Sequence, residues 1–318
     1  MARFILQNDL VVSDTATGLA WTKDAALSEF PLTWKEALDF VADLNRAEYG
    51  GHTDWKLPNR RELFSLASHD TINPSLPAGH LFENVFHGYY WTSTTCHRLP
   101  DQAWYVHMGG ARVFKGMKQG SYMVWPVRLP PETPGRLLAT GQQRCYTRSG
   151  KAADCAGTGQ DGAFGSGRTA PPRFIDQGDT FYDTLTRLPW LKPSLLPAAL
   201  SDWPSTFEAV DQMNRDHAFG RSDWRVPHII EMESLVHMGR HSPAVAVDDQ
   251  RERVQPFYWS ATTSAYNTDY AWVLYFNDGA VGVGFKPLAE FFLWPVAGTP
   301  QSPPVPGLAG PGPTTNLF

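Results

Sequence analysis

The apolar residues between Trp34 and Asn45 recur at helical intervals, which predicts an amphipathic helix with one buried face. Thr33 and Glu36 have the spacing of a capping box, in which each side chain accepts a hydrogen bond from the other residue's backbone N–H. The pattern therefore predicts a helix that begins at Trp34.

A second, shorter helix is predicted after Leu57-Pro58, with Asn59 as its N-cap, Glu62 three residues later, and Leu63 and Leu66 facing inward. The rest of this part of the chain favours β-structure, because short aromatic and β-branched runs alternate with turn residues. These strand segments are a strand and turn over Val11–Trp21, then Tyr89–Thr94, Trp104–Met108, Ala111–Lys115 and Tyr122–Arg128, with a hairpin turn at Gly109-Gly110.

The whole pattern occurs twice. Twelve tryptophans fall into two sets of six, and each member of the second set lies 168 or 169 residues after its counterpart, as Trp190 does after Trp21. Neighbouring residues repeat as well, since Asp54-Trp55-Lys56-Leu57-Pro58 returns as Asp223-Trp224-Arg225-Val226-Pro227. A period of this length indicates a duplicated domain rather than a solenoid. We interpret the tryptophans as core residues that both copies need, in preference to a sugar-stacking stripe.

The predicted fold class is α+β, with two tandem domains that each contain two helices and a small antiparallel sheet. We call residues 1–128 copy one and residues 173–297 copy two. Residues 129–172 between them are rich in Gly, Ser, Thr and Pro and form a connector. Residues 298–318 form a Pro- and Gly-rich tail without charged side chains.

Charge and hydropathy narrow the range of partners. The net charge of −5 and the pI near 6.0 argue against nucleic acid as a partner. No apolar run is long enough to span a bilayer. No signal peptide is visible after Met1, so we expect either a cytoplasmic protein or one whose export signal is not in this sequence.

Two of the three cysteines are candidates for a disulfide. Cys145 and Cys155 lie ten residues apart in the connector, where a bond would close a short loop; two free thiols are the alternative. Cys96 has no evident partner, and its neighbour His97 alone does not make it a catalytic thiolate, which needs a positioned base. With no other acid–base constellation, we expect no enzymatic activity.

The motifs of both copies resemble the DUF1566 family, also described as the C-terminal domain of the Legionella collagen-like protein. The residues that carry this resemblance in copy one are Asp14, Thr17-Gly18-Leu19, Trp21, Asp54-Trp55, Leu57-Pro58-Asn59, Glu62-Leu63, Tyr90-Trp91-Thr92-Ser93-Thr94, Ala103-Trp104 and Trp125-Pro126-Val127-Arg128. The connector, from Thr140-Gly141-Gln142 to Gly162, is similar to the segment that introduces this domain in exported bacterial proteins.

The resemblance implies a C-type-lectin-like fold, an extracellular or cell-surface location and a binding or adhesive role. Related folds include the formylglycine-generating enzymes, but these use a pair of working cysteines and copy two has none. Copy two also departs from the family pattern, because Arg187 replaces the glycine of the Thr-Gly-Leu turn, His228 replaces the N-cap asparagine and Ala297 replaces Arg128.

Recognition is expected where the copies differ, because loops that vary on a fixed scaffold commonly carry binding. The loop after the Tyr-Trp motif and the following hairpin differ most, and in copy two they are rich in Tyr, Asn and Asp, as in a paratope. The candidate ligand-binding residues are Tyr266, Asn267, Asp269, Tyr270, Tyr275, Asn277 and Asp278 in copy two, and His97, Arg98 and Asp101 in copy one. Ordinary polar turns are the alternative.

A calcium site is a further expectation, because lectin-like folds often bind Ca²⁺ through loop oxygens. Asp269, Asn277 and Asp278 are its candidate ligands, and solvated turn residues are the simpler interpretation. No other cofactor is expected. Two functions remain open: binding of a glycan or protein ligand through these loops, or structural self-assembly as a homo-oligomer through residues 297–318.

Overall fold

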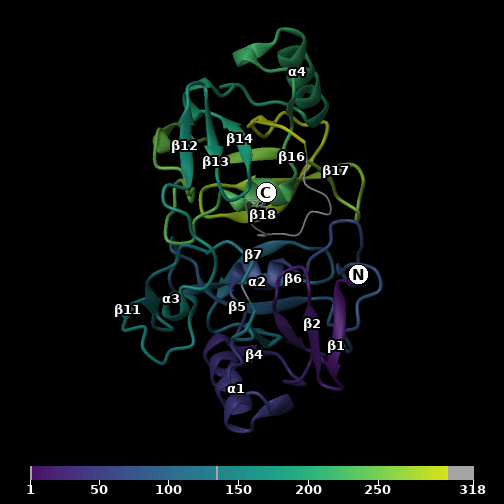
Figure 1. Ribbon diagram of the computed structural model, residues 1–318, viewed down its shortest axis with the longest axis vertical. Coiled ribbons are helices and arrows are strands. Elements are labelled where there is room, and N and C mark those ends of the chain that lie inside the picture. The colour runs from purple at the N-terminus through teal and green to yellow at the C-terminus, as the bar shows by residue number, and fades with distance from the viewer. Residues whose placement is uncertain (1, 134, 300–318) are drawn as a thin grey trace, which may run out of the picture.

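The computed structural model describes residues 2–133 and 135–299. Copy one (purple to blue) and copy two (green to yellow) lie end to end along the long axis, and the connector lies beside copy one (Figure 1). The described residues combine five α-helices with mainly antiparallel sheets, in agreement with the mixed helix and sheet composition predicted. Most of the predicted tail, residues 300–318, lies outside the described residues.

The elements that the two copies share follow the same order in each, although a few short strands and 3₁₀ turns occur in one copy only. Copy one contains β1 (Phe4–Asn8), β2 (Val11–Asp14), β3 (Ala20–Thr22), β4 (Leu32–Thr33), α1 (Trp34–Arg46), η1 (Tyr49–Gly51), α2 (Arg60–Phe64), β5 (Tyr89–Thr95), β6 (Gln102–His107), β7 (Val113–Met117), β8 (Ser121–Tyr122) and β9 (Val127–Arg128). Copy two contains β12 (Phe174–Gln177), β13 (Thr180–Asp183), β14 (Leu188–Leu191), η2 (Pro193–Leu195), α4 (Trp203–Arg215), η3 (Ala218–Gly220), β15 (Trp224–Arg225), α5 (Ile229–Ser234), η4 (Arg251–Arg253), β16 (Phe257–Thr263), β17 (Tyr270–Tyr275), β18 (Ala280–Phe285) and β19 (Val296–Ala297).

The predicted helix starts are confirmed. At α1, the Glu36 carboxylate accepts a hydrogen bond from the Thr33 N–H over 2.8 Å, and the Thr33 hydroxyl accepts one from the Glu36 N–H. At α2, Asn59 and Glu62 form the same reciprocal pair. Each box satisfies two N–H groups that a helix start leaves without an intrahelical partner.

The turn of copy two that lacks its glycine is retained. Gly18 has φ +81° and donates its N–H to the Asp14 carbonyl. Arg187 occupies the matching place with φ +61° and donates to the Asp183 carbonyl over 2.6 Å. A non-glycine residue in this region of backbone space is uncommon. Copy two therefore keeps the geometry of this turn although glycine, the residue that best suits it, is replaced.

The two small sheets expected from the sequence are halves of one sheet. Its strand order is β16-β17-β18-β7-β6-β5, and the two copies join where β18 pairs antiparallel with β7, with Val281 opposite Val113. Each copy also has a second sheet, in which its early strands pair with its last strand: β1-β2-β3-β9 in copy one and β12-β13-β14-β19-β15 in copy two.

One expected strand is divided. Residues 122–128 were predicted as a single strand, but Tyr122 pairs with Leu32 in β4, whereas Val127 pairs with Trp21 in β3. Pro126 lies between them and has no N–H to donate to a ladder. The strand β1 was not predicted at all, because only the first of its five residues is buried and its hydrophobic pattern does not alternate.

The tryptophans lie in the core, as predicted. Eleven of the twelve are buried and Trp203 is half-buried. A single hydrophobic cluster contains Trp21 and Trp125 of copy one together with Trp190 and Trp294 of copy two. The core is therefore continuous across the boundary between the copies.

Charged residues unique to each copy also cross this boundary. The fully buried guanidinium of Arg60 in α2 pairs with the buried carboxylate of Glu233 in α5. Arg61 donates to the Val236 carbonyl over 2.6 Å and lies 3.4 Å from the same carboxylate. The counterpart of Arg60 is Ile229, so this contact exists once rather than twice.

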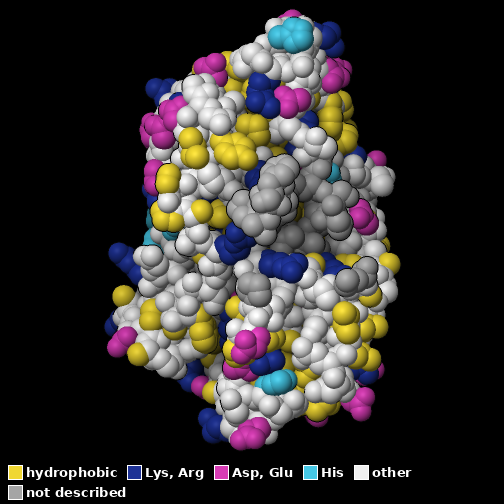
Figure 2. Space-filling view, in the orientation of Figure 1, with side chains coloured by type: hydrophobic (Ala, Val, Ile, Leu, Met, Phe, Trp, Pro, Cys, Tyr) yellow, Lys and Arg dark blue, Asp and Glu magenta, His cyan; other side chains and the backbone are white. Residues whose placement is uncertain are grey.

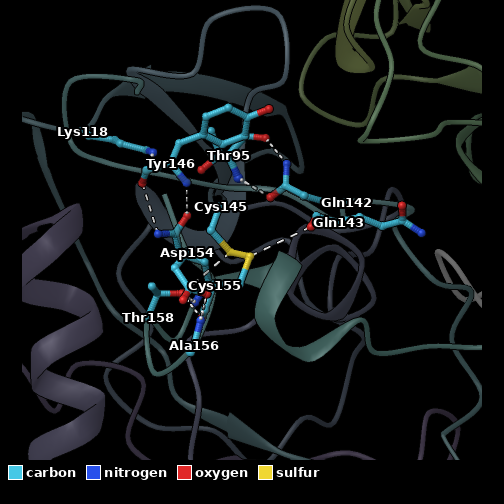
Figure 3. Close-up of a disulfide and its surroundings, with 11 residues drawn as sticks. Thr95, Lys118, Gln142, Gln143, Cys145, Tyr146, Asp154, Cys155, Ala156 and Thr158 are labelled. Carbon is cyan, nitrogen blue, oxygen red and sulfur yellow. Dashed lines mark hydrogen bonds between the residues drawn. A yellow bond between two sulfur atoms is a disulfide. The ribbon is translucent and has the colours of Figure 1, made fainter. Parts of the chain in front are cut away.

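The connector packs against copy one. It contains β10 (Cys145–Tyr146), β11 (Ala152–Ala153) and α3 (Asp161–Phe164), and the expected Cys145–Cys155 disulfide is present, with Cα atoms 5.2 Å apart (Figure 3). The side-chain amide of Gln142 forms two hydrogen bonds with the backbone of Thr95, at 2.9 and 2.7 Å (Figure 3).

Candidate functional site

The site that best suits a ligand is a pocket of about 500 Å³ where copy one meets copy two. Its lining comes from both copies: Tyr89, His107, Gly110 and Arg112 of copy one, and Ser264, Tyr266, Asn267, Tyr270, Trp272 and Val283 of copy two. An aromatic lining with a few polar groups is typical of small-molecule sites.

The loop between β16 and β17 supplies one wall. Asn267 organises this loop, because its side-chain oxygen accepts a hydrogen bond from the Asp269 N–H and its carbonyl accepts one from the Tyr270 N–H. Ser264 closes the loop by donating to the Tyr270 carbonyl over 2.9 Å. Tyr266 lies at the tip, 72% exposed, where its ring is available to a ligand.

Copy one supplies the opposite wall. Tyr89 at the start of β5 lies opposite His107 at the end of β6, and their ring centroids are 4.9 Å apart. The His107 N–H donates to the Arg112 carbonyl, which places Arg112 just beyond the Gly109-Gly110 hairpin. The side chain of Arg112 is exposed and forms no ion pair within the described residues.

Trp272 forms the buried floor. It is 3% exposed and lies opposite Val283 in the β17–β18 ladder. The ring of His69 contacts it edge-on, with centroids 5.0 Å apart. Burial lowers the pKa of His69 to about 3, so this ring is neutral and adds no charge beneath the pocket. The indole N–H of Trp272 has no hydrogen-bond partner within the described residues.

Arg112 is the one charged residue of the lining at neutral pH. Burial, and then the nearby Arg112 charge, lower the pKa of His107, so its imidazole is neutral there. No Asp or Glu lines the pocket. The site therefore combines aromatic rings, hydroxyl and amide groups, and one guanidinium.

The duplication would place a second such pocket at the pseudo-symmetric position, but an ion pair occupies that position, which we call the closed position. Counting 168 residues along the chain, Gly110 corresponds to Asp278, and Lys115 corresponds to Val283. Lys115 and Asp278 form an ion pair across the boundary, and the Lys115 ammonium lies 5.5 Å from the ring centroid of Trp104, the counterpart of Trp272. The open pocket has Gly and Val where the closed position has the ion pair.

Three of the ten predicted ligand-binding residues, Tyr266, Asn267 and Tyr270, line this pocket together. Asp269 is exposed on the same loop but does not line it. Tyr275 packs its ring against Phe257 and Phe291, with centroids 6.2 and 6.0 Å apart.

The expected calcium ligands do not converge. Asp269 precedes β17, whereas Asn277 and Asp278 follow its other end. The carboxylate of Asp278 is buried and bound by Lys115. The described residues contain no group of three or more His, Cys, Asp or Glu side chains placed to hold a metal ion. The strand β17, Tyr270–Tyr275, separates Asp269 from Asn277 and Asp278, so these three residues are not gathered at one place.

The candidate residues of copy one lie elsewhere, against the connector. The imidazole Nδ1 of His97 is 3.2 Å from the Tyr146 hydroxyl, and its ring lies 5.5 Å from that of His241. The Asp101 carbonyl accepts a hydrogen bond from the Lys118 N–H. Arg98 is exposed and lies on the same loop, between His97 and Asp101 in sequence.

The sequence prediction missed the half of the pocket that copy one supplies. A usable signal was present, because His107 and Arg112 differ from their counterparts Tyr275 and Ala280. The comparison of loops within each copy could not reveal that one copy's loop faces the other copy's hairpin.

Two other places in the described residues are less suited to catalysis or ligand binding. Cys96 is buried, and burial raises the pKa of its thiol, which disfavours the thiolate. A larger groove of about 700 Å³ runs between α1 and the connector, but Lys35 and Lys56 on its lining are already paired with Asp39 and Glu62. On the face shown in Figure 2, acidic, basic and hydrophobic side chains are interspersed over both copies.

Comparison with protein families gives one finding. The family model described as the Lcl C-terminal domain matches the chain twice, over residues 10–128 and 179–297. Comparison with curated proteins gives no match. Among the described residues, no helix is long and apolar enough to cross a membrane.

Proposed function

The chain belongs to the Lcl C-terminal domain family, and on this basis we propose that it is a non-enzymatic surface or secreted protein that binds a glycan or protein ligand in the pocket between its two copies. The observation that carries the proposal is the pocket that Tyr266 and Tyr270 of copy two line together with Tyr89 and Arg112 of copy one.

A C-type-lectin-like scaffold is part of this proposal. Loops on rigid sheets commonly carry recognition, and here the loop before β17 is fixed by Asn267 while leaving the Tyr266 ring exposed. Tyrosine and asparagine in such loops supply rigid aromatic area and adaptable hydrogen bonding.

The alternative function is structural self-assembly through residues 297–318. Its support is compositional, because this segment is rich in Pro and Gly and carries no charge. Ala297 belongs to β19, and residues 300–318 lie outside the described residues. The pocket therefore favours ligand binding as the first function to test.

The test is binding of the labelled full chain to arrays of immobilised glycans and of extracellular proteins. Tyr266→Ala and Tyr270→Ala should each weaken binding about tenfold, because a buried aromatic contact typically contributes 1–2 kcal/mol. Phe30→Ala is the matched control, since Phe30 is 71% exposed and lies outside the pocket. If both tyrosine variants bind as well as the wild type, the pocket is not the ligand site.

A further inference from the structure

We propose that the pocket between the copies binds a zwitterionic group of the phosphocholine type, with its ammonium over the ring of Trp272 and its phosphate at Arg112. This inference rests on the proposed function, because it names the ligand chemistry of the same pocket. The open pocket and its closed pseudo-symmetric counterpart differ in the charged side chains next to their tryptophans.

The closed position shows which groups this environment accommodates. There the Lys115 ammonium lies 5.5 Å from the centroid of the Trp104 ring and is paired with the Asp278 carboxylate. Such a distance permits a cation–π attraction, which strengthens when the cation is removed from water. The closed position thus holds the Lys115–Asp278 ion pair next to a buried tryptophan, whose ring centroid also lies 5.1 Å from the Arg60 guanidinium.

The open pocket retains the tryptophan and lacks both charges. Val283 stands where Lys115 does, and Gly110 stands where Asp278 does. No Lys or Arg of the described residues lies over the Trp272 ring. A ligand that carries an ammonium and an anion would replace the missing pair.

The remaining lining suits both ends of such a ligand. The rings of Tyr89, Tyr266 and Tyr270 line the same pocket as Trp272, and aromatic side chains around a cation are the usual receptor for quaternary ammonium groups. These rings can enclose the ammonium without a carboxylate, which agrees with the absence of Asp and Glu from the lining.

Arg112 selects for the anion. An exposed guanidinium without an ion-pair partner can bind phosphate through two parallel hydrogen bonds. The same charge repels a ligand that is only cationic, and a ligand that is only anionic would leave the aromatic rings unused. Hydroxyl groups of the tyrosines and the amide of Asn267 add further donors for the phosphate oxygens.

The proposal is tested by calorimetric titration of the full chain with phosphocholine, choline chloride and inorganic phosphate. We expect one phosphocholine site per chain, with choline and phosphate each binding at least about tenfold more weakly. Arg112→Met should weaken phosphocholine binding and leave choline binding unchanged or stronger, which separates the two ends of the ligand.

The closed position supplies a matched variant. Gly110→Asp with Val283→Lys transplants the Lys115–Asp278 pair into the open pocket and should abolish phosphocholine binding. Gly110 does not have positive φ, and a Cβ added there meets only the His107 ring at 3.7 Å, so the aspartate fits. The reverse change, Lys115→Val with Asp278→Gly, should leave the stoichiometry at one site in a chain whose circular dichroism is unchanged, because the opened position has Ala280 where the pocket has Arg112.

Phosphocholine that fails to bind at millimolar concentration, or binds equally well to the Gly110→Asp, Val283→Lys variant, overturns the proposal. If glycan or protein binding is lost in Tyr266→Ala while the wild type ignores phosphocholine, the proposed function stands and this inference fails. If neither binding depends on Tyr266, both fail. When phosphocholine does bind, phosphatidylcholine vesicles and a phosphocholine–albumin conjugate distinguish a lipid source from a soluble or glycan-borne one.

Discussion

The indole N–H of Trp34 donates to the Thr92 carbonyl over 2.7 Å. In copy two, the indole N–H of Trp203 donates over 2.8 Å to the carbonyl of Ser260, which is the counterpart of Thr92. The same duplication holds for three further pairs: Trp55 with Trp224, Trp91 with Trp259, and Trp125 with Trp294. Tryptophan at these positions fixes the backbone as well as filling the core. Function is therefore to be sought in residues that the copies do not share.

Asp161 of the connector is such a residue, and it predicts a pH dependence of stability. Its buried carboxylate accepts hydrogen bonds from the hydroxyls of Thr94 and Thr140, at 2.8 and 2.7 Å. Burial nevertheless raises its pKa to about 6. The folded protein thus retains a proton that the unfolded chain loses near pH 4.

The sign follows from linkage. Between about pH 4 and 6 the unfolded chain binds fewer protons at this group than the folded chain does, so its contribution to stability falls as pH rises, and it is constant above pH 6. Asp161→Asn keeps an oxygen for both threonines and removes the ionisation. We predict that the variant lacks this fall and is up to about 3 kcal/mol more stable than the wild type at pH 7. Urea denaturation of the wild type and the variant at pH 4 and pH 7 measures these free energies of unfolding. If the variant changes in stability between the two pH values as much as the wild type does, the assignment is contradicted.

At the scale of elements, the contact between α2 and α5 depends on a charge pair that a symmetric duplication could not form. Arg60 and Glu233 are both fully buried, and the matching residues of the opposite copies are Ile229 and Phe64. Removing one partner of a buried pair leaves the other charge uncompensated in a poorly solvating environment. The interface is therefore expected to be sensitive to single changes and more tolerant of paired ones.

Glu233→Ala should lower the free energy of unfolding by about 3–5 kcal/mol, because Arg60 and Arg61 lose their only carboxylate among the described residues. Adding Arg60→Ile, the residue of copy two, should recover part of the loss. Urea denaturation of the two single variants and the double variant gives the coupling energy. Additive effects of the two changes would show that the pair does not stabilise the contact.

Local signals in the sequence predicted the elements that rest on local physics. Thr33 with Glu36, and Asn59 with Glu62, predicted both helix starts, because capping is decided within four residues. Three of the strands and the hairpin turn at Gly109-Gly110 also follow the predicted pattern. Tyr122–Arg128 was mispredicted because its two ends pair with different distant strands.

For a related reason, the sequence predicted only the wall of the pocket that copy two supplies. Tyr266, Asn267 and Tyr270 carry a compositional signal within one loop, and they do line it. Tyr89, His107 and Arg112 join them only because β18 pairs with β7, a contact between residues 168 positions apart, as Val113 and Val281 are. No periodicity within either copy encodes that pairing.

At the scale of the whole molecule, the two copies form one folded unit. One hydrophobic cluster includes residues of both, the six-stranded sheet crosses between them, and the connector packs on copy one instead of spanning open solvent. The ligand pocket exists because of this union, since neither copy alone supplies both of its walls.

Differential scanning calorimetry of the full chain tests this union most directly. If the copies share one core, the chain should unfold in a single transition whose calorimetric enthalpy equals its van't Hoff enthalpy, and Glu233→Ala should lower the midpoint of that whole transition. Two separate transitions in the wild type, with only one of them shifted by Glu233→Ala, would show that the copies fold independently and that the pocket between them is not a fixed feature of the molecule.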